Sequence, residues 1–166
     1  MKEIVFEDRQ YDVFKMFSED WALATAGDSL NDYNTLTIGW GSMGTLWGGR
    51  SIITVYVSPA RYTYEYLEKS DTFTVSFFGE SYKKALAYLG SHSGRDEDKV
   101  AASGLTPVLS EPGITFKEAK LTFVCKKIYA DAFDGDRAPE DIKERLYTKI
   151  PAHHFYIGEI IKVLEA

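Results

Sequence analysis

Six runs of aromatic and β-branched residues recur along the chain, and this recurrence limits the fold more than any other feature. The clearest run, residues 72–78, alternates hydroxyl-bearing and apolar side chains, which is the period of a β-strand with two different faces. Phe73, Val75 and Phe77 are therefore expected to share one face. Gly, Pro, Asp and Asn interrupt the chain between the runs, as they do between strands. The expected strands span residues 21–27, 33–41, 51–58, 72–78, 121–130 and 155–164.

Four helical segments are expected between the strands, at residues 62–69, 81–89, 95–103 and 139–146. Each is too short to be stable alone in water, so each must pack on the strands. Few connections are long enough for a crossover helix, which favours a mainly antiparallel barrel with short peripheral helices over a parallel α/β sheet. A chain of 166 residues is expected to form a single domain. Residues 1–20 are expected to pack on that domain as an N-terminal segment.

The charge balance excludes one broad class of function. Acidic residues outnumber basic ones by 25 to 19, giving a net charge of −6. A general nucleic-acid-binding protein normally carries a basic surface, so no nucleic acid is expected as partner. The apolar runs are shorter than a bilayer span, and charged residues near the start leave no room for a signal peptide. A cytoplasmic protein without membrane contact is expected.

Several motif-like patterns are better explained by structure than by chemistry. Residues 39–44 match G-x-G-x-x-G and residues 44–51 approach a P-loop, but both are followed by a β-type run where a nucleotide site needs a helix. We interpret both as a glycine-rich turn between strands. His153 and His154 point to opposite faces of a strand and cannot chelate one metal ion together. Cys125, the single cysteine, lies among apolar residues and is expected to be buried. The acidic stretch 131–141 is expected to be a surface loop, without calcium-site spacing.

A phosphate site is one interpretation of the segment that ends the third strand. Arg61 follows Ser58 and Pro59, and a short helix begins near Tyr62. The first turn of a helix offers free N–H groups and a partial positive charge. The Arg61 guanidinium and the hydroxyls of Ser58 and Thr63 can complete a phosphate cradle. The alternative is an exposed arginine beside a threonine that only caps the helix.

A flat ring is the ligand suggested by the preceding strand. Thr35 and Thr37 share a face of the expected strand, and Gly39 allows close approach to the backbone on that face. Asn34 lies where the strand begins, and Trp40 flanks the turn at its other end. A polar strand edge beside an aromatic side chain suits a heteroaromatic ligand that needs in-plane hydrogen bonds and stacking. The alternative is a threonine-rich strand with one polar face in water.

A third polar segment, residues 90–99, is expected to be a loop that enters a helix. Ser93 and Asp96 have the spacing of a capping box. Arg95 and Lys99 lie one turn apart and can face an anion together. The alternative is that they pair with the neighbouring acidic residues 96–98.

Together these segments carry a family resemblance. Residues 34–41, 58–63, 90–99 and 154–160 resemble the flavin reductase-like family of FMN-binding split barrels, in particular its flavoredoxin-type branch. The resemblance extends from about residue 21 to the end of the chain. It implies a six-stranded antiparallel Greek-key split barrel. It also implies a homodimer that binds FMN non-covalently near the subunit interface.

The resemblance also assigns residue roles. Arg61, Tyr62 and Thr63 would hold the FMN phosphate, strand residues from Asn34 onward would line the isoalloxazine ring, and Lys99 would lie near the flavin. The complete implied cofactor site is Asn34, Thr35, Leu36, Thr37, Trp40, Ser42, Ser58, Arg61, Tyr62, Thr63 and Lys99. No residue is expected to be catalytic by itself and no metal is expected, because FMN carries the chemistry.

Three functions are compatible with this site. The first is an oxidoreductase that takes electrons from NAD(P)H through bound FMN. The second is an electron carrier or flavin-binding module that a partner protein reduces. The third is a β-barrel without cofactor. The NAD(P)H-dependent oxidoreductase is the predicted function and the carrier or binding module is its alternative, although fold and cofactor transfer within a family more safely than substrate does.

Overall fold

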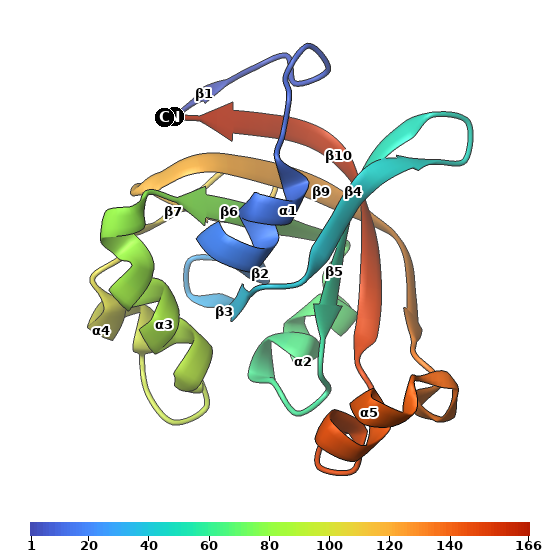
Figure 1. Ribbon diagram of the computed structural model, residues 1–166. Coiled ribbons are helices and arrows are strands. Elements are labelled where there is room, and N and C mark those ends of the chain that lie inside the picture. The colour runs from blue at the N-terminus through green and yellow to red at the C-terminus, as the bar shows by residue number, and fades with distance from the viewer.

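One antiparallel sheet, strongly bent, dominates the computed structural model, which describes residues 1–166 (Figure 1). Its strands follow the order β3-β2-β6-β9-β10-β5-β4, and β1 pairs with the end of β10. The two termini therefore lie side by side. Strands β7 and β8 form a separate hairpin. The strands are β1 (Lys2–Glu3), β2 (Ala22–Ser29), β3 (Asp32–Ile38), β4 (Gly41–Leu46), β5 (Arg50–Val57), β6 (Thr72–Phe78), β7 (Pro107–Leu109), β8 (Ile114–Phe116), β9 (Ala119–Ala132) and β10 (His154–Glu165).

Short helical elements occupy the connections between the strands. α3 and α4 lie together on one side of the sheet, whereas α2 and α5 lie near the ends of β5 and β10 (Figure 1). None of the helices is long and apolar enough to cross a membrane. The helical elements are α1 (Val13–Lys15), η1 (Met16–Asp20), α2 (Tyr62–Lys69), η2 (Glu80–Tyr82), α3 (Lys83–Ser91), α4 (Lys99–Ser103), η3 (Gly135–Arg137), α5 (Glu140–Ile142) and η4 (Lys143–Tyr147).

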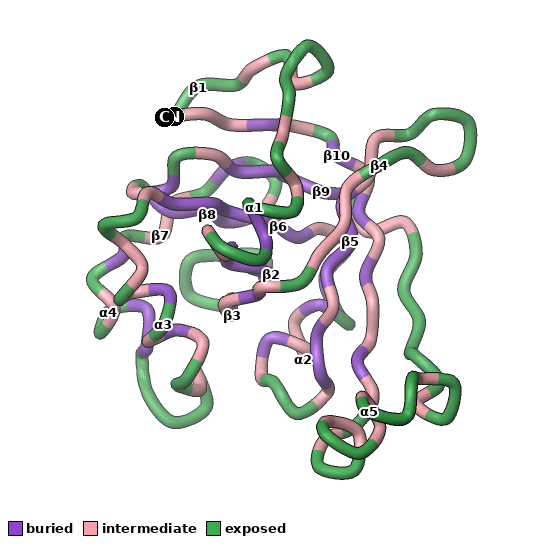
Figure 2. The backbone as a smooth tube through the Cα atoms, viewed as in Figure 1, coloured by how far each residue is buried: buried purple, intermediate pink, exposed green.

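Strands β2 and β3 separate two hydrophobic clusters, so both of their faces are covered. On one face Ala24 and Leu36 belong to a large cluster that includes the β6 residues Phe73, Val75 and Phe77. On the other face Leu23 packs with side chains from α3 and α4. Figure 2 shows the buried backbone concentrated along these central strands. Neighbouring residues of β3 consequently face two different interiors.

The predicted fold class is confirmed: the chain is mainly β, antiparallel, and decorated by short helices. Residues 62–69 and 72–78 form a helix and a strand with the predicted bounds. The shared face of Phe73, Val75 and Phe77 is also confirmed. The hydroxyl face of β6 is buried too, because Thr74 donates a hydrogen bond to the Ile114 carbonyl of β8. Cys125 is fully buried as expected, and burial raises the pKa of its thiol.

The strand count differs from the prediction, because the main sheet has eight strands where six were expected. The expected strand 33–41 ends at Ile38, and the chain then pairs with β5 as the unpredicted strand β4. Glycine disfavours strands, so the sequence 39–49 suggests one long turn. The turn itself is confined to residues 47–49, where Gly48 and Gly49 have φ of +80° and +91°.

Candidate functional site

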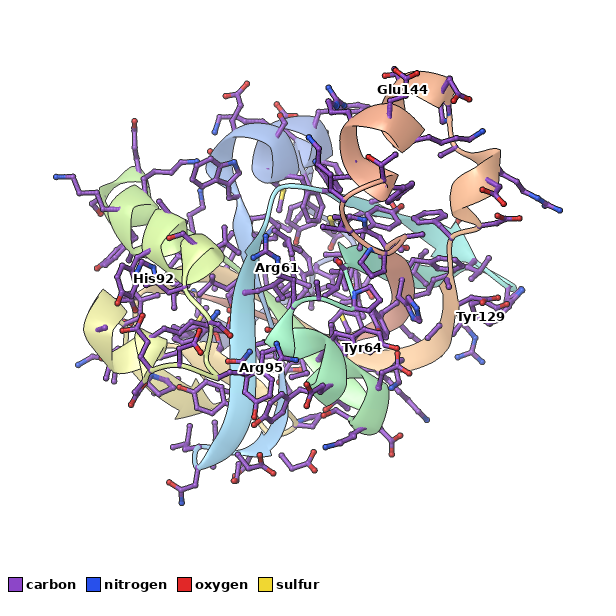
Figure 3. All side chains as sticks on the ribbon, turned by 90° about the horizontal axis from the view of Figure 1, so that it is seen from below. Arg61, Tyr64, His92, Arg95, Tyr129 and Glu144 are labelled. Atoms are coloured by element: carbon purple, nitrogen blue, oxygen red, sulfur yellow. The ribbon has the colours of Figure 1, made fainter.

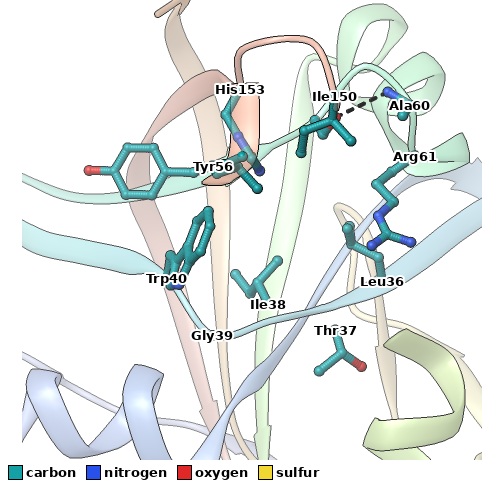
Figure 4. A pocket seen from close by; sticks show the side chains of 12 residues that line it. Leu36, Thr37, Ile38, Gly39, Trp40, Tyr56, Ala60, Arg61, Ile150 and His153 are labelled. Atoms are coloured by element: carbon teal, nitrogen blue, oxygen red, sulfur yellow. Dashed lines mark hydrogen bonds between the residues drawn. The ribbon is translucent and has the colours of Figure 1, made fainter. Parts of the chain in front are cut away.

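A cavity of about 500 Å³ opens beside β3, at the end of the sheet. Its walls come from the end of β3, the loop between β5 and α2, and the segment between η4 and β10 (Figure 4). β3 is the terminal strand of the sheet, so one edge of its backbone has no partner strand. The lining residues are Leu36, Thr37, Ile38, Gly39, Trp40, Tyr56, Ser58, Ala60, Arg61, Leu146, Ile150 and His153. The cavity thus combines an apolar interior with a few polar groups, as ligand sites commonly do.

A smaller pocket of about 80 Å³ adjoins the cavity and shares Leu36, Ala60 and Arg61 with it. Its other walls are the first turn of α2, the chain from Leu89 to Ser93, and Lys99. Two cationic side chains, Arg61 and Lys99, therefore line a space the size of a small anion. Because Arg61 lines both spaces, the small pocket and the cavity lie directly beside each other.

Arg61 is placed by the start of α2. It is the N-cap residue with an extended backbone, and its N–H donates to the Ser58 carbonyl at 2.9 Å. The N–H groups of Tyr62 and Thr63 lie in the first helical turn, where no intrahelical acceptor exists. The Arg61 side chain is exposed and extends toward Leu36 at the cavity (Figure 4). Sequence and geometry agree here on the elements of an anion site.

Asn34 and Thr63 connect β3 to α2. The Asn34 amide donates to the Thr63 hydroxyl oxygen at 2.9 Å, and both side chains are buried. The Thr63 hydroxyl can therefore still donate its own hydrogen. Gly94 lies against this pair, because a side chain there would collide with the Asn34 amide oxygen. Gly90 similarly lies 3.2 Å, measured to a hypothetical Cβ, from Thr37. Two glycines thus let the last turn of α3 and the loop after it pack closely on β3.

Lys99 is buried, with 4% of its surface exposed, although it is charged in its ordinary state. Its ammonium group donates to the carbonyls of Leu89 and His92, each at 3.0 Å. An ammonium group has three hydrogens, so one donor remains for a ligand. Burial, followed by the nearby Arg61 charge, lowers the pKa of Lys99 to about 8. An anion between Arg61 and Lys99 would favour the charged form of Lys99.

His153 is a site residue that the sequence analysis missed. It lies 8% exposed just before β10, its imidazole points into the cavity, and its Nδ1 is buried without a hydrogen-bond partner (Figure 4). Burial and then Arg61 lower the pKa of His153. His154, in contrast, packs on Tyr64 and lies 3.8 Å from the Glu68 carboxylate. The two histidines thus have different surroundings, and no local sequence pattern indicates what either ring contacts.

The alternation of β3 decides where Thr35 and Thr37 lie relative to the cavity. Thr35 and Thr37 share a face, but it is the face beneath α3. The Thr35 hydroxyl is fully buried and lies 2.8 Å from that of Thr25. The Thr37 hydroxyl donates to the Leu86 carbonyl at 2.5 Å, so only the edge of Thr37 reaches the cavity. Leu36 and Ile38, on the opposite face, line the cavity instead.

The other predicted residues divide between the cavity and its border. Trp40 lines the cavity and remains 55% exposed. The Ser58 hydroxyl lies at the cavity wall, where it accepts a hydrogen bond from the Ala60 N–H. Ser42 does not line the cavity. Its hydroxyl lies 3.4 Å from the Tyr56 hydroxyl, behind the wall that Tyr56 forms.

The predicted capping box at Ser93 and Asp96 is wrong. The helix begins later, at Lys99, and Asp98 caps it by accepting from the Ala101 N–H. Arg95 lies before this helix, so it does not share a helical face with Lys99. It pairs with Glu65 and its guanidinium stacks 4.7 Å from the Tyr62 ring centre, beside α2 (Figure 3). No group of three or more His, Cys, Asp or Glu side chains is arranged to hold a metal ion.

The structure is thus a bent antiparallel β-sheet with two adjoining pockets at one edge. Residues 16–166 match the model of the flavin reductase like domain. The chain therefore belongs to the flavin reductase-like family, as the sequence motifs suggested. No curated protein sequence matches it.

Solved structures support the same fold at low sequence identity. Flavoredoxin of Desulfovibrio vulgaris (Miyazaki F) is 24% identical, with a TM-score of 0.68 over 100% of this chain and 77% of that chain. Flavoredoxin from Methanosarcina acetivorans is 20% identical, with a TM-score of 0.68 over 100% and 76%. An FMN-binding protein from Thermus thermophilus, with bound 1-cyclohex-2-enone, is 20% identical, with a TM-score of 0.69 over 99% and 80%. The predicted split-barrel fold is thus confirmed.

Proposed function

We propose that this protein binds FMN non-covalently and passes electrons through it. The observation that carries the proposal is that a phosphate-sized pocket adjoins a ring-sized cavity, with Arg61 lining both. FMN has the matching construction, with a phosphate at one end of a short chain and a flat ring system at the other. The names of the structural relatives, an FMN-binding protein and two flavoredoxins, support the same cofactor.

The phosphate would occupy the smaller pocket. Arg61 offers a forked, charge-assisted pair of donors, and the first-turn N–H groups of Tyr62 and Thr63 add a partial positive charge. Lys99 offers its remaining hydrogen from a buried position. The Thr63 hydroxyl is oriented for donation, because its oxygen already accepts from Asn34. Four kinds of donor thus converge on one small space.

The isoalloxazine ring would occupy the cavity beside β3. Leu36 and Ile38 offer an apolar floor, and Trp40 offers an aromatic rim. The open backbone edge of β3 offers N–H and C=O groups for the polar edge of the ring. FMN, when bound, supplies the exchange of electrons and hydride at its ring. The chain's own task is to hold that ring, exclude water from it and stabilise charge near it.

NAD(P)H is the proposed electron donor, and reduction by a partner protein is the second candidate. The second candidate is favoured by the composition of the cavity wall, where Arg61 is the only Arg or Lys. A dinucleotide carries further phosphates, and the cavity offers no second cation for them. If a partner protein reduces the bound FMN, the protein works as an electron carrier.

Two measurements test these proposals. Titration of FMN with the purified protein should quench flavin fluorescence with a one-to-one endpoint, and absence of saturable binding contradicts the cofactor assignment. Anaerobic addition of NADH or NADPH should then bleach the flavin absorbance. If neither nucleotide bleaches bound FMN but dithionite does, the carrier function replaces the oxidoreductase function.

A homodimer is also proposed, and exposed aromatic side chains support it. Trp47, at the tip of the β4–β5 hairpin, is 60% exposed and contacts Tyr129 of β9, which is 43% exposed. Phe155 of β10 stacks on Tyr129 with ring centres 6.0 Å apart. Exposed aromatic clusters of this kind are enriched in protein interfaces. Light scattering should give twice the chain mass, and Trp47→Lys should shift the protein toward the monomer.

A further inference from the structure

Five aromatic rings form a second hollow directly beside the ring cavity. The hollow measures about 220 Å³ and is lined by Trp40, Tyr56, Phe133, Tyr147 and His153. These rings come from five separate parts of the chain. The hollow shares Trp40, Tyr56 and His153 with the cavity proposed for the ring of FMN. A molecule in the hollow would therefore lie next to that ring.

The imidazole of His153 supplies a polar group to this hollow. It lies between Trp40 and Tyr147, with ring centres 5.1 and 5.9 Å away. Its Nδ1 is buried without a hydrogen-bond partner, although the residue is more than nine-tenths buried. An unsatisfied buried polar atom costs about 1–3 kcal/mol, so its retention needs a reason. A ligand that hydrogen-bonds to the imidazole supplies that reason.

We propose that this hollow is a second-substrate subsite for a small, uncharged, planar compound with a conjugated carbonyl group. The carbonyl oxygen would accept a hydrogen bond from the His153 imidazole, while the flat faces of the compound pack against the aromatic rings. This inference rests on the proposed function, because it assigns the compound that meets the bound flavin.

The surrounding charges favour an uncharged occupant. Aromatic faces are electron-rich and disfavour an anion, and Glu140, Asp141 and Glu144 lie on the same α5–η4 segment as Tyr147. A cation is disfavoured because Arg61 lines the adjoining cavity together with His153, and its charge contributes to the lowered pKa of His153. Burial contributes most to that lowering, so the imidazole is neutral at pH 7 and offers one N–H.

The α5–η4 segment has a second role in this arrangement. Leu146 and Ile150 close the outer wall of the ring cavity, and Tyr147 closes the hollow. Phe133 stacks on Tyr56 with ring centres 5.7 Å apart, which fixes the opposite wall. The chain from residue 133 to residue 153, for which the sequence predicted an acidic surface loop at 131–141 and a helix at 139–146, thus shapes the access route to the site.

Coumarin and naphthalene provide a matched test, since both are flat two-ring molecules and only coumarin has a carbonyl group. Calorimetric titrations would use the purified full chain, with and without saturating FMN. We expect coumarin to bind at least about fivefold more tightly than naphthalene, the effect of one buried hydrogen bond. His153→Phe should remove this preference, whereas His154→Phe, at the adjacent histidine outside the hollow, should retain it. Tyr147→Ala should weaken both ligands.

Several results would overturn the inference. Equal affinity for coumarin and naphthalene would show that His153 forms no hydrogen bond to the ligand. Tighter binding of N-methylquinolinium than of coumarin would show that the hollow prefers a cation. Coumarin affinity that falls as protein concentration rises means that a second copy of the chain fills the hollow. If FMN does not bind, only the proposed function is contradicted. The subsite is tested separately, by measuring whether binding of coumarin to the FMN-free chain depends on His153. If His153→Phe does not fold, His153→Gln and Tyr147→Ala carry the test.

Discussion

Replacement of Arg61 by alanine is the sharpest test of the phosphate site. Arg61 forms no ion pair with a carboxylate. Arg95 lies beside the same helix, where it pairs with Glu65 and stacks on the Tyr62 ring. In the complex, Arg61→Ala would remove at least one charge-assisted hydrogen bond to phosphate, a loss of about 1.5–3 kcal/mol. Each 1.4 kcal/mol corresponds to about a tenfold change in Kd. The expected result is FMN binding weakened by about 10- to 100-fold.

The same substitution should leave the cofactor-free protein as stable as before, because an exposed arginine without a partner contributes little. FMN affinity is measured by quenching of flavin fluorescence, and stability by urea unfolding. Arg95→Ala is the matched control and should change FMN affinity by less than about threefold. Equal FMN affinity for Arg61→Ala and the original protein would refute the assignment of the phosphate to this pocket.

A second consequence of Arg61→Ala concerns its neighbour. Arg61 is one of the two causes that lower the pKa of Lys99. Without Arg61 the pKa of Lys99 should rise above its value of about 8, and NMR of the lysine side chain can follow this change. An unchanged pKa would mean that the two cations do not face the same space.

Three further predictions concern pH, packing and the face of β3. FMN affinity should fall as pH rises from 7 to 9, because Lys99 loses its proton near pH 8, and Lys99→Arg should make affinity independent of pH over this range. Gly94→Ala should weaken FMN binding and lower the melting temperature, because the added methyl group displaces Asn34. Gly44→Ala, where the added methyl group meets no atom within 4 Å, should do neither. Thr35→Val should cost about 1–3 kcal/mol in unfolding experiments but leave FMN affinity unchanged, because its hydroxyl bonds away from the cavity.

The folding contribution of Lys99 has the opposite pH dependence to its ligand contribution. Its pKa is about 8 in the folded chain and 10.5 in its ordinary state, so the unfolded chain binds more protons between these values. The part of the unfolding free energy that Lys99 controls therefore rises as pH increases from 8 to 10.5. Burial of Lys99 thus lowers stability at neutral pH while keeping a donor at the proposed phosphate position.

The sequence predicted the central strands and α2 well, because their patterns are local. Residues 72–78 carry a strict alternation, and the start of α2 follows from Pro59 and the polar residues beside it. The same local logic failed at β4, where glycines resemble a turn and only pairing with β5 makes a strand. It also failed at Ser93 and Asp96. α4 begins only at Lys99, whose side chain is buried, and Asp98 is therefore the residue that caps the helix.

The candidate site was predictable where one segment supplies several groups and unpredictable where distant segments meet. Arg61, Tyr62 and Thr63 follow one another at the start of α2, so helix geometry suggested an anion site there and the family resemblance supplied their joint role. The face of Thr35 and Thr37 could not be assigned, since both sides of β3 are covered and alternation does not say which side holds a ligand.

His153 shows the same limit most clearly. Its neighbour relation to His154 predicted different surroundings for the two rings but not what each ring contacts. Only the fold brings Trp40, Tyr56, Phe133 and Tyr147 around His153. These five rings are separated by up to 113 positions in sequence, from Trp40 to His153. A site built from single residues of five segments has no local motif, so substrate choice in this family is expected to vary through such residues while the phosphate segment stays recognisable.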